Sequence, residues 1–200
     1  MDTIKAIEAR RAVKHYDPDF TMPEDDKQKF RHLLRQAPTS FNIQNWRVVD
    51  VKDRDLRAKI RAAAWDQAQV TDASLLYVIC ADVKAYEKAP ERYWSDAPQD
   101  VQDMMAPMIM EFYKGREWMQ RDEAMRSAGI AAQTLMLAAK AMGYDSSPMI
   151  GFDVDAVGKL INLPADHVVC MMLAIGKGIM PARPKGGYID DSEVFLDNHF

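Results

Sequence analysis

Two uninterrupted runs of apolar residues, at 74–82 and 167–175, constrain the fold more than any other feature of this sequence. They contain the segments LLYVICA (75–81) and VVCMML (168–173). Runs of this length, rich in Val, Ile and Leu and without polar alternation, are typical of strands buried on both faces. The sequence therefore predicts a sheet that is covered by helices on both sides.

Helical patterns occupy most of the remaining chain. Apolar spacing predicts a first helix that is capped by Asp2 or Thr3 and runs through about Arg11. A capping-box pattern at 21–24 predicts a second helix, which ends near Pro38. Further predicted elements are a strand at 46–51, a helix capped by Asp53, helices over 101–112 and 128–139, a left-handed C-terminal cap at Gly143, and a helix over 153–163. This order indicates an α+β domain with helices on both faces of a small sheet.

The length and the net charge of the chain limit the classes of protein to which it can belong. A chain of 200 residues fits one domain, here taken as 1–200, with 177–200 as a turn-rich tail. With 30 acidic and 26 basic residues, the net charge of -4 gives no overall support for a nucleic-acid or acidic-membrane partner. No apolar signal core or span of ~20 apolar residues is evident, so a cytoplasmic location is expected. Cys80 and Cys170 lie inside the apolar runs, which suits reduced core thiols, and no metal-ligand spacing occurs among the histidines.

Two basic clusters lie near opposite ends of the chain. They are the segments RRAVK (10–14) and RPK (183–185). Converging on one phosphate, they would supply charge-assisted hydrogen bonds. The alternative is that the first cluster complements a helix dipole and the second is a solvated tail. From the clusters alone, the alternative is favoured.

Two polar connections are also candidates for ligand contact. The segment 37–47 offers hydroxyls, amides and backbone N–H groups, although the same residue types routinely satisfy a turn. The segment SSPMIGFD (146–153) is expected to run from a helix end to a helix start, with a close backbone approach at Gly151. It reads equally well as an ordinary turn.

Taken in order, these segments resemble the FMN-dependent nitroreductase family over nearly the whole chain. The family's opening motif has two basic residues, a small hydroxyl residue, then a spaced cation and an aromatic, and it resembles RRAVKHY (10–16). Its second motif, Ala-Pro-Ser-Ser-x-Asn-x-Gln-Pro-Trp, resembles APTSFNIQNW (37–46) and is the most specific match. Later segments that resemble the family are 65–74, 129–143, 148–153 and 175–176.

The resemblance implies a three-layer α/β/α fold whose intertwined homodimer builds two FMN sites between its subunits, with the tail 177–200 embracing the partner. Arg10, within the basic segment Arg10-Arg11-Ala12, and a tail cation, Arg183 or Lys185, would hold the phosphate. Lys14 would reach the ribityl chain or the pyrimidine edge. The other implied contacts are Pro38, Thr39, Ser40 and Asn42 from the partner, Gln67 or Gln69 toward the ring, and Pro148, Met149, Ile150 and Gly151 at the flavin edge.

Several positions depart from the family pattern. Ala12 replaces the usual serine, Asn45 a proline, and Ser127 an aspartate that commonly precedes the central helix. Ile150 stands where some members are acidic, and Gly186-Gly187 replaces a frequent terminal arginine. These differences bear on the phosphate contacts and the substrate range more than on the fold.

The implied activity is hydride transfer from NADH or NADPH through flavin N5 to an electron-poor acceptor, a nitroaromatic or a quinone, by a ping-pong mechanism. Lys14 would give electrostatic support, and no side-chain nucleophile is required. The alternatives are other flavin chemistry on the same fold, such as reductive dehalogenation or flavin fragmentation, and a flavin-binding protein without turnover.

Overall fold

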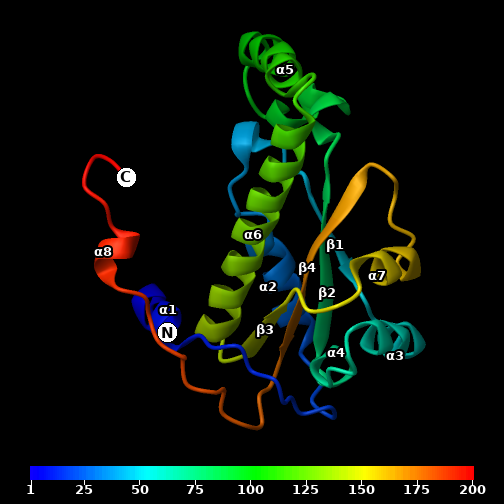
Figure 1. Cartoon of the computed structure of the whole chain (residues 1–200). Coiled ribbons are helices and arrows are strands. Elements are labelled where there is room, and N and C mark those ends of the chain that lie inside the picture. Colours follow the sequence, from blue (N-terminus) through cyan, green and yellow to red (C-terminus); the bar gives the residue numbers. More distant parts are fainter.

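Four strands form one antiparallel sheet at the centre of the molecule, in a computed structural model that describes residues 1–200 (Figure 1). The spatial order is β1 (Trp46–Asp50), β2 (Leu75–Asp82), β4 (His167–Gly176) and β3 (Asp145–Met149). The two apolar runs are thus the two inner strands, β2 and β4, as their composition predicts. Every residue of β2 is buried, because helices cover both faces of the sheet.

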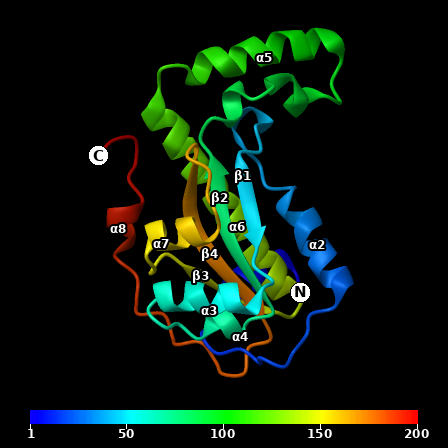
Figure 2. The same ribbon diagram turned by 90° about the vertical axis from the view of Figure 1, so that its right-hand side faces the viewer.

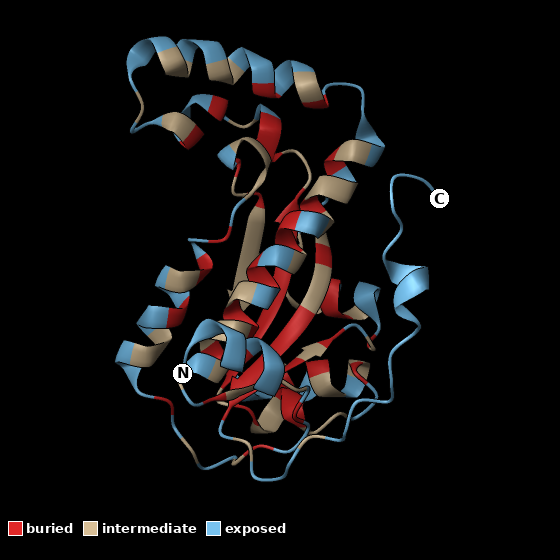
Figure 3. Ribbon diagram, turned by 90° about the vertical axis from the view of Figure 1, so that its left-hand side faces the viewer, coloured by how far each residue is buried: buried red, intermediate tan, exposed pale blue.

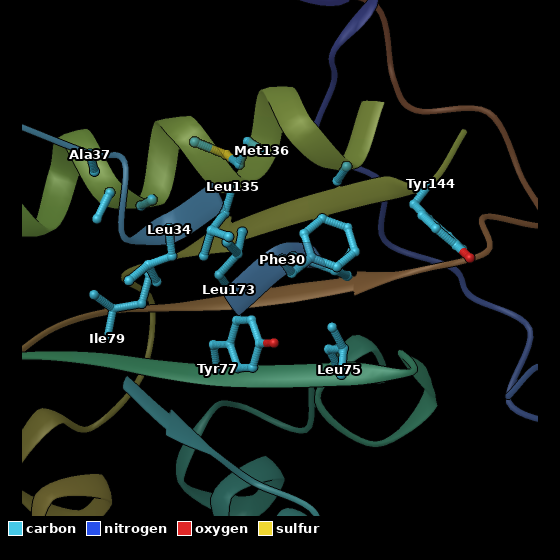
Figure 4. Close-up of a cluster of buried hydrophobic side chains, with 14 of the residues drawn as sticks. Phe30, Leu34, Ala37, Leu75, Tyr77, Ile79, Leu135, Met136, Tyr144 and Leu173 are labelled. Atoms are coloured by element: carbon cyan, nitrogen blue, oxygen red, sulfur yellow. The ribbon is translucent and has the colours of Figure 1, made fainter. Parts of the chain in front are cut away.

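One face of the sheet is covered by α2 (Glu24–Leu34) and by the long α6 (Glu117–Ala141). Their shared core contains Phe30, Leu135, Tyr77 and Leu173 (Figure 4). Fully buried alanines on α6 allow the helix to approach the strands closely. The short α1 (Thr3–Ala9) packs against α6 from outside.

The other face is covered by α3 (Arg54–Ala63), α4 (Gln69–Asp72) and α7 (Val154–Leu160), as Figure 2 shows. Ile60, Val78, Val157 and Met172 belong to the core on this side. The predicted α+β architecture in three layers, α/β/α, is therefore confirmed.

A helical projection stands beyond one end of the sheet (Figure 2). It comprises η1 (Ser40–Asn42), η2 (Ala85–Glu87), η3 (Pro90–Trp94) and α5 (Gln99–Tyr113). The tail, with α8 (Asp191–Val194), runs outside the body and is exposed along nearly its whole length (Figure 3). No helix here is both long enough and apolar enough to cross a membrane.

Local signals were right at two helix caps and wrong at several other positions. Asp53 accepts a hydrogen bond from Leu56 N at 2.6 Å, and Gly143 has φ +86°, as predicted. The first helix ends at Ala9, however, and the second ends at Leu34 and not near Pro38. The second helix, α2, begins after Pro23 without any side-chain cap, so no capping box forms at 21–24. The segment 146–149 is part of β3 and not a helix-to-helix turn. Pro148 is tolerated there because β3 is an edge strand.

Candidate functional site

The opening segment, the edge strand β3 and the start of the tail meet at one end of the sheet. Ala12 forms an isolated parallel bridge to Ser146, and Val13 N donates to Ser146 O at 3.1 Å. The tail then returns past the same segment, where Ile179 N donates to His15 O at 3.1 Å. The fold therefore brings both ends of the chain to the strand that leads into Pro148.

Three cations at this end have no acidic partner. Arg10 is half-buried and Lys14 and Arg183 are exposed, and none of them takes part in a salt bridge. Partial desolvation lowers the pKa of Lys14 from its ordinary value. Positive charge is thus left uncompensated in a protein whose net charge is -4.

Two further predicted cations are already engaged. Arg11 donates to the carbonyl oxygens of Glu8 and Arg10, at 2.6 and 2.8 Å. Lys185 Nζ donates to Tyr188 Oη at 2.7 Å and lies 4.8 Å from the centre of that ring. Of the two predicted tail cations, Arg183 is therefore the one whose donors are free.

The turn after β3 presents backbone donors to solvent. The N–H groups of Ile150 and Gly151 have no acceptor within the chain, and the Ile150 side chain is 77% exposed. Met149, by contrast, is buried in the core, so that only its backbone is available. A ligand with acceptor atoms fits this turn.

A pair of glutamines supports the same turn from behind. Gln67 Nε2 donates to Gly151 O at 2.8 Å, and Gln69 Nε2 donates to Gln67 Oε1 at 2.9 Å. Gln69 itself is buried and reaches the turn only through Gln67.

Trp65 was not singled out from the sequence, yet it lies directly on this turn. Its side chain is 74% exposed, and a Cβ built on Gly151 would lie 2.5 Å from the indole Cζ3. Its backbone is left-handed, with φ +52°. The only signal in the sequence is a large aromatic inside a polar connection.

The loop 38–42 lies at the opposite end of the sheet. Ser40 N donates to Glu123 Oε1 near the start of α6, at 3.4 Å, and Asn42 Nδ2 donates to Tyr93 O at 2.7 Å. Thr39 Oγ1 accepts from Gln44 N at 3.0 Å, so this hydroxyl also serves the turn. From Glu123 to the end of α6 beside β3 the helix spans about 25 Å at about 1.5 Å per residue. One chain therefore does not bring loop 38–42 to the cations.

Glu123 supplies a carboxylate close to position 127, where this chain has serine in place of the family's common aspartate. Ser127 Oγ donates to Glu123 Oε1 at 3.0 Å, in the turn of α6 below loop 38–42. A carboxylate thus lies at this end of α6 although residue 127 is serine. The spacing of four residues on one helix was the signal that could have identified the pair.

Other candidate features lie elsewhere. A cavity of about 660 Å³ between α6, α7 and the start of β4 contains none of the predicted site residues. Asp82, Asp166 and His167 have ligand atoms within 4.8 Å of one another. The Lys88 ammonium bridges the two carboxylates, at 2.8 and 2.5 Å, so this cluster is an ion-pair network with its cation in place.

Comparison with known proteins gives a consistent answer over most of the chain. Residues 7–177 match the sequence profile of the nitroreductase family. Protein DrgA from Synechocystis sp. is 53% identical over 177 residues, which cover 88% of this chain and 84% of that protein. The Bacillus subtilis protein named "Putative NAD(P)H nitroreductase MhqN" is 32% identical over 197 residues, 96% of each chain. A crystal structure from Exiguobacterium sibiricum, a "putative nitroreductase in complex with FMN", has a TM-score of 0.91 at 25% identity, covering 99% of this chain and 98% of that one. The chain belongs to the nitroreductase family.

Proposed function

We propose that this protein is an FMN-dependent oxidoreductase that uses NADH or NADPH to reduce a small electron-poor acceptor, a nitroaromatic or a quinone. When bound, FMN would supply the chemistry of hydride transfer between the nicotinamide and the acceptor, so that donor and acceptor would occupy one site in turn. The names of relatives support both halves of this proposal, since one binds FMN and another is called an NAD(P)H nitroreductase. The protein's own residues would bind the FMN phosphate, orient the ring and stabilise the charge on the reduced flavin.

The observation that carries the proposal is the uncompensated positive charge on the two chain segments that meet beside β3. Arg10 and Arg183 have no acidic partner. Arg10 is two residues before Ala12, which bridges to Ser146 of β3, and Arg183 is four residues after Ile179, which donates to His15 O. A charge-assisted hydrogen bond to phosphate contributes roughly 1.5–3 kcal/mol, and Arg presents a fork that matches phosphate oxygens. Arg10 and Arg183 would hold the phosphate, and Lys185 would add charge from the tail.

The turn itself would hold the ring. The N–H groups of Ile150 and Gly151, which are free in this chain, would donate to acceptor atoms on the flavin edge, and Pro148 would pack on the ring. Lys14 would lie at the pyrimidine edge, where its ammonium would stabilise negative charge on the reduced ring. Gln67 fixes the turn through Gly151 O.

A second copy of the chain completes each site. Pro38, Thr39, Ser40 and Asn42 lie too far along α6 to reach the cations of their own chain, so in this proposal they come from the partner of a homodimer. The exposed tail 177–200, which has large apolar side chains such as Phe195 and Phe200 in solvent, embraces that partner.

The visible absorption spectrum of the purified protein tests the proposal. Oxidised flavin is expected, either as purified or after FMN is added, and anaerobic NADH or NADPH should bleach it. A nitroaromatic or quinone should then restore the oxidised spectrum. Protein that leaves the spectrum and fluorescence of added FMN unchanged would contradict the proposal, and bound FMN that neither nicotinamide reduces would support a binding protein without turnover.

A further inference from the structure

An exposed tryptophan is fixed against the turn that the proposed function assigns to the flavin edge. Trp65 lies between α3 and α4 and exposes 74% of its side chain. Its indole nevertheless contacts Gly151, because a Cβ at that residue would lie 2.5 to 3.3 Å from three indole carbons. The benzo edge of the ring, at Cε3, Cζ3 and Cη2, thus lies on the turn, and most of the side chain is open to solvent.

The backbone that carries this side chain is held in an uncommon conformation. Trp65 and Asp66 have φ +52° and +54°, in the left-handed region that bulky residues rarely adopt. Asp66 N donates to Arg61 O at 3.1 Å, and Arg61 Nε pairs with Asp66 Oδ1 at 2.7 Å. Gln67, the next residue, is bonded to Gly151 O. Such outliers persist where surrounding contacts maintain them, and they concentrate at ligand sites.

The position and chemistry of the indole fit one class of ligand. An aromatic face stacks in offset or edge-to-face geometry on other planar rings. Indole is also electron-rich, so its preferred partners are the electron-poor rings of quinones and nitroaromatics. An acceptor without a planar ring gains nothing from this wall.

We propose that Trp65 is a specificity-determining residue whose indole forms one wall of the acceptor site and selects planar aromatic acceptors. This inference rests on the proposed function, because the turn at Gly151 is where that function locates the flavin. Gly151 is required for this position of the indole, because any side chain at residue 151 would displace it. The Arg61–Asp66 pair positions the tryptophan and does not touch the acceptor.

The test compares FMN-loaded wild type with Trp65→Leu and Trp65→Phe. The dissociation constant of 1,4-naphthoquinone is measured on the oxidised enzyme without nicotinamide, from the change in flavin absorbance. Steady-state KM is then measured for 1,4-naphthoquinone and for hexacyanoferrate(III), an acceptor without a planar ring. Since Trp65 is exposed, both variants should fold, which thermal unfolding and FMN affinity will confirm.

The leucine variant should weaken naphthoquinone binding and raise its KM by about 2- to 12-fold, the effect of losing one aromatic pair. Phenylalanine should restore most of the affinity, while FMN affinity and the KM for hexacyanoferrate(III) stay unchanged. A leucine variant that retains FMN and binds naphthoquinone as tightly as wild type would overturn the role of Trp65, and it would leave the proposed function standing. Wild-type protein that binds no FMN would overturn the proposed function as well.

Discussion

Two inactive variants of this protein should regain activity when their subunits are exchanged. The first, Arg10→Ala/Lys14→Ala, removes two cations at the β3 end of the molecule. The second, Asn42→Ala, removes the hydrogen bond to Tyr93 O and places alanine at φ +55°, a conformation that asparagine tolerates better. The two changes lie about 25 Å apart along α6 within one chain, at about 1.5 Å per residue.

The magnitude follows from twofold symmetry. Refolding an equal mixture gives about half heterodimers, and in each of these one shared site collects both defects while the other is intact. About a quarter of wild-type activity should therefore return, measured as NADH oxidation with a quinone acceptor. If both segments served the same subunit's site, every site would keep one defect.

A wild-type sample taken through the same unfolding and refolding sets the scale, and native mass spectrometry counts the heterodimers. Heterodimers present in the expected proportion, without recovered activity, would refute the shared site. They would leave FMN binding by the cations untouched.

The remaining predictions address single features. Arg10→Ala should weaken FMN binding roughly 10- to 100-fold, the loss of one charge-assisted contact, in a titration of apoprotein; unchanged affinity would remove Arg10 from the site. Arg57 is buried and donates to the carbonyl oxygens of Val51, Ala73 and Ser74 at 2.7, 2.5 and 3.2 Å, so Arg57→Met should lower the free energy of unfolding by roughly 3 kcal/mol in urea. The hydrogen bond from Lys88 lowers the pKa of Asp166 to about 2, so the ionised carboxylate stabilises the fold above its ordinary pKa and this contribution is lost as the pH falls toward 2. The effect is modest because the side chain is 37% exposed, and Asp166→Asn should lose less stability than wild type between pH 5 and 2. Gly129 lies at the centre of α6, where we expect the α6 helices of two subunits to meet, so Gly129→Arg should leave the monomer folded but abolish the dimer in size-exclusion chromatography. A stable dimer with arginine at this position would contradict that contact.

The fold could be predicted largely from features that are local in the sequence. Both inner strands follow from apolar runs that need no partner to be recognised, and Asp53 and Gly143 act through contacts within a few residues. Edge strand β3 was missed because Ser146, Ser147 and Pro148 are turn-forming types, and only its pairing with β4 reveals an edge position. Thr21 does not cap α2, because the helix begins at Glu24 and Pro23 occupies the N-cap position.

The candidate site was less accessible from sequence, for a physical reason. Resemblance supplied the residue types at 10–14, 37–46 and 148–151, but free donors can be recognised only after every acceptor in the fold is known. The N–H groups of Ile150 and Gly151, and the missing partners of Arg10 and Arg183, are properties of this kind. Trp65 is recognisable only by its contact with Gly151, which lies far away in the sequence.

The geometry of α6 links the shared site to the form of the dimer. Loop 38–42 contacts the helix near its beginning and the cations lie near its end, so a twofold axis that joins them must set the two copies of α6 antiparallel. Such helices cross near their centre, and the centre of Glu117–Ala141 is Gly129. A Cβ added there meets no atom of this chain within 4 Å, and the neighbouring Ile130 is 42% exposed. The glycine therefore has no steric function within its own subunit, whereas in the proposed dimer it would allow the backbone of a second α6 to approach closely. In the proposed dimer the helix that separates the two halves of the site within one chain is the same helix whose contact brings them together between two chains.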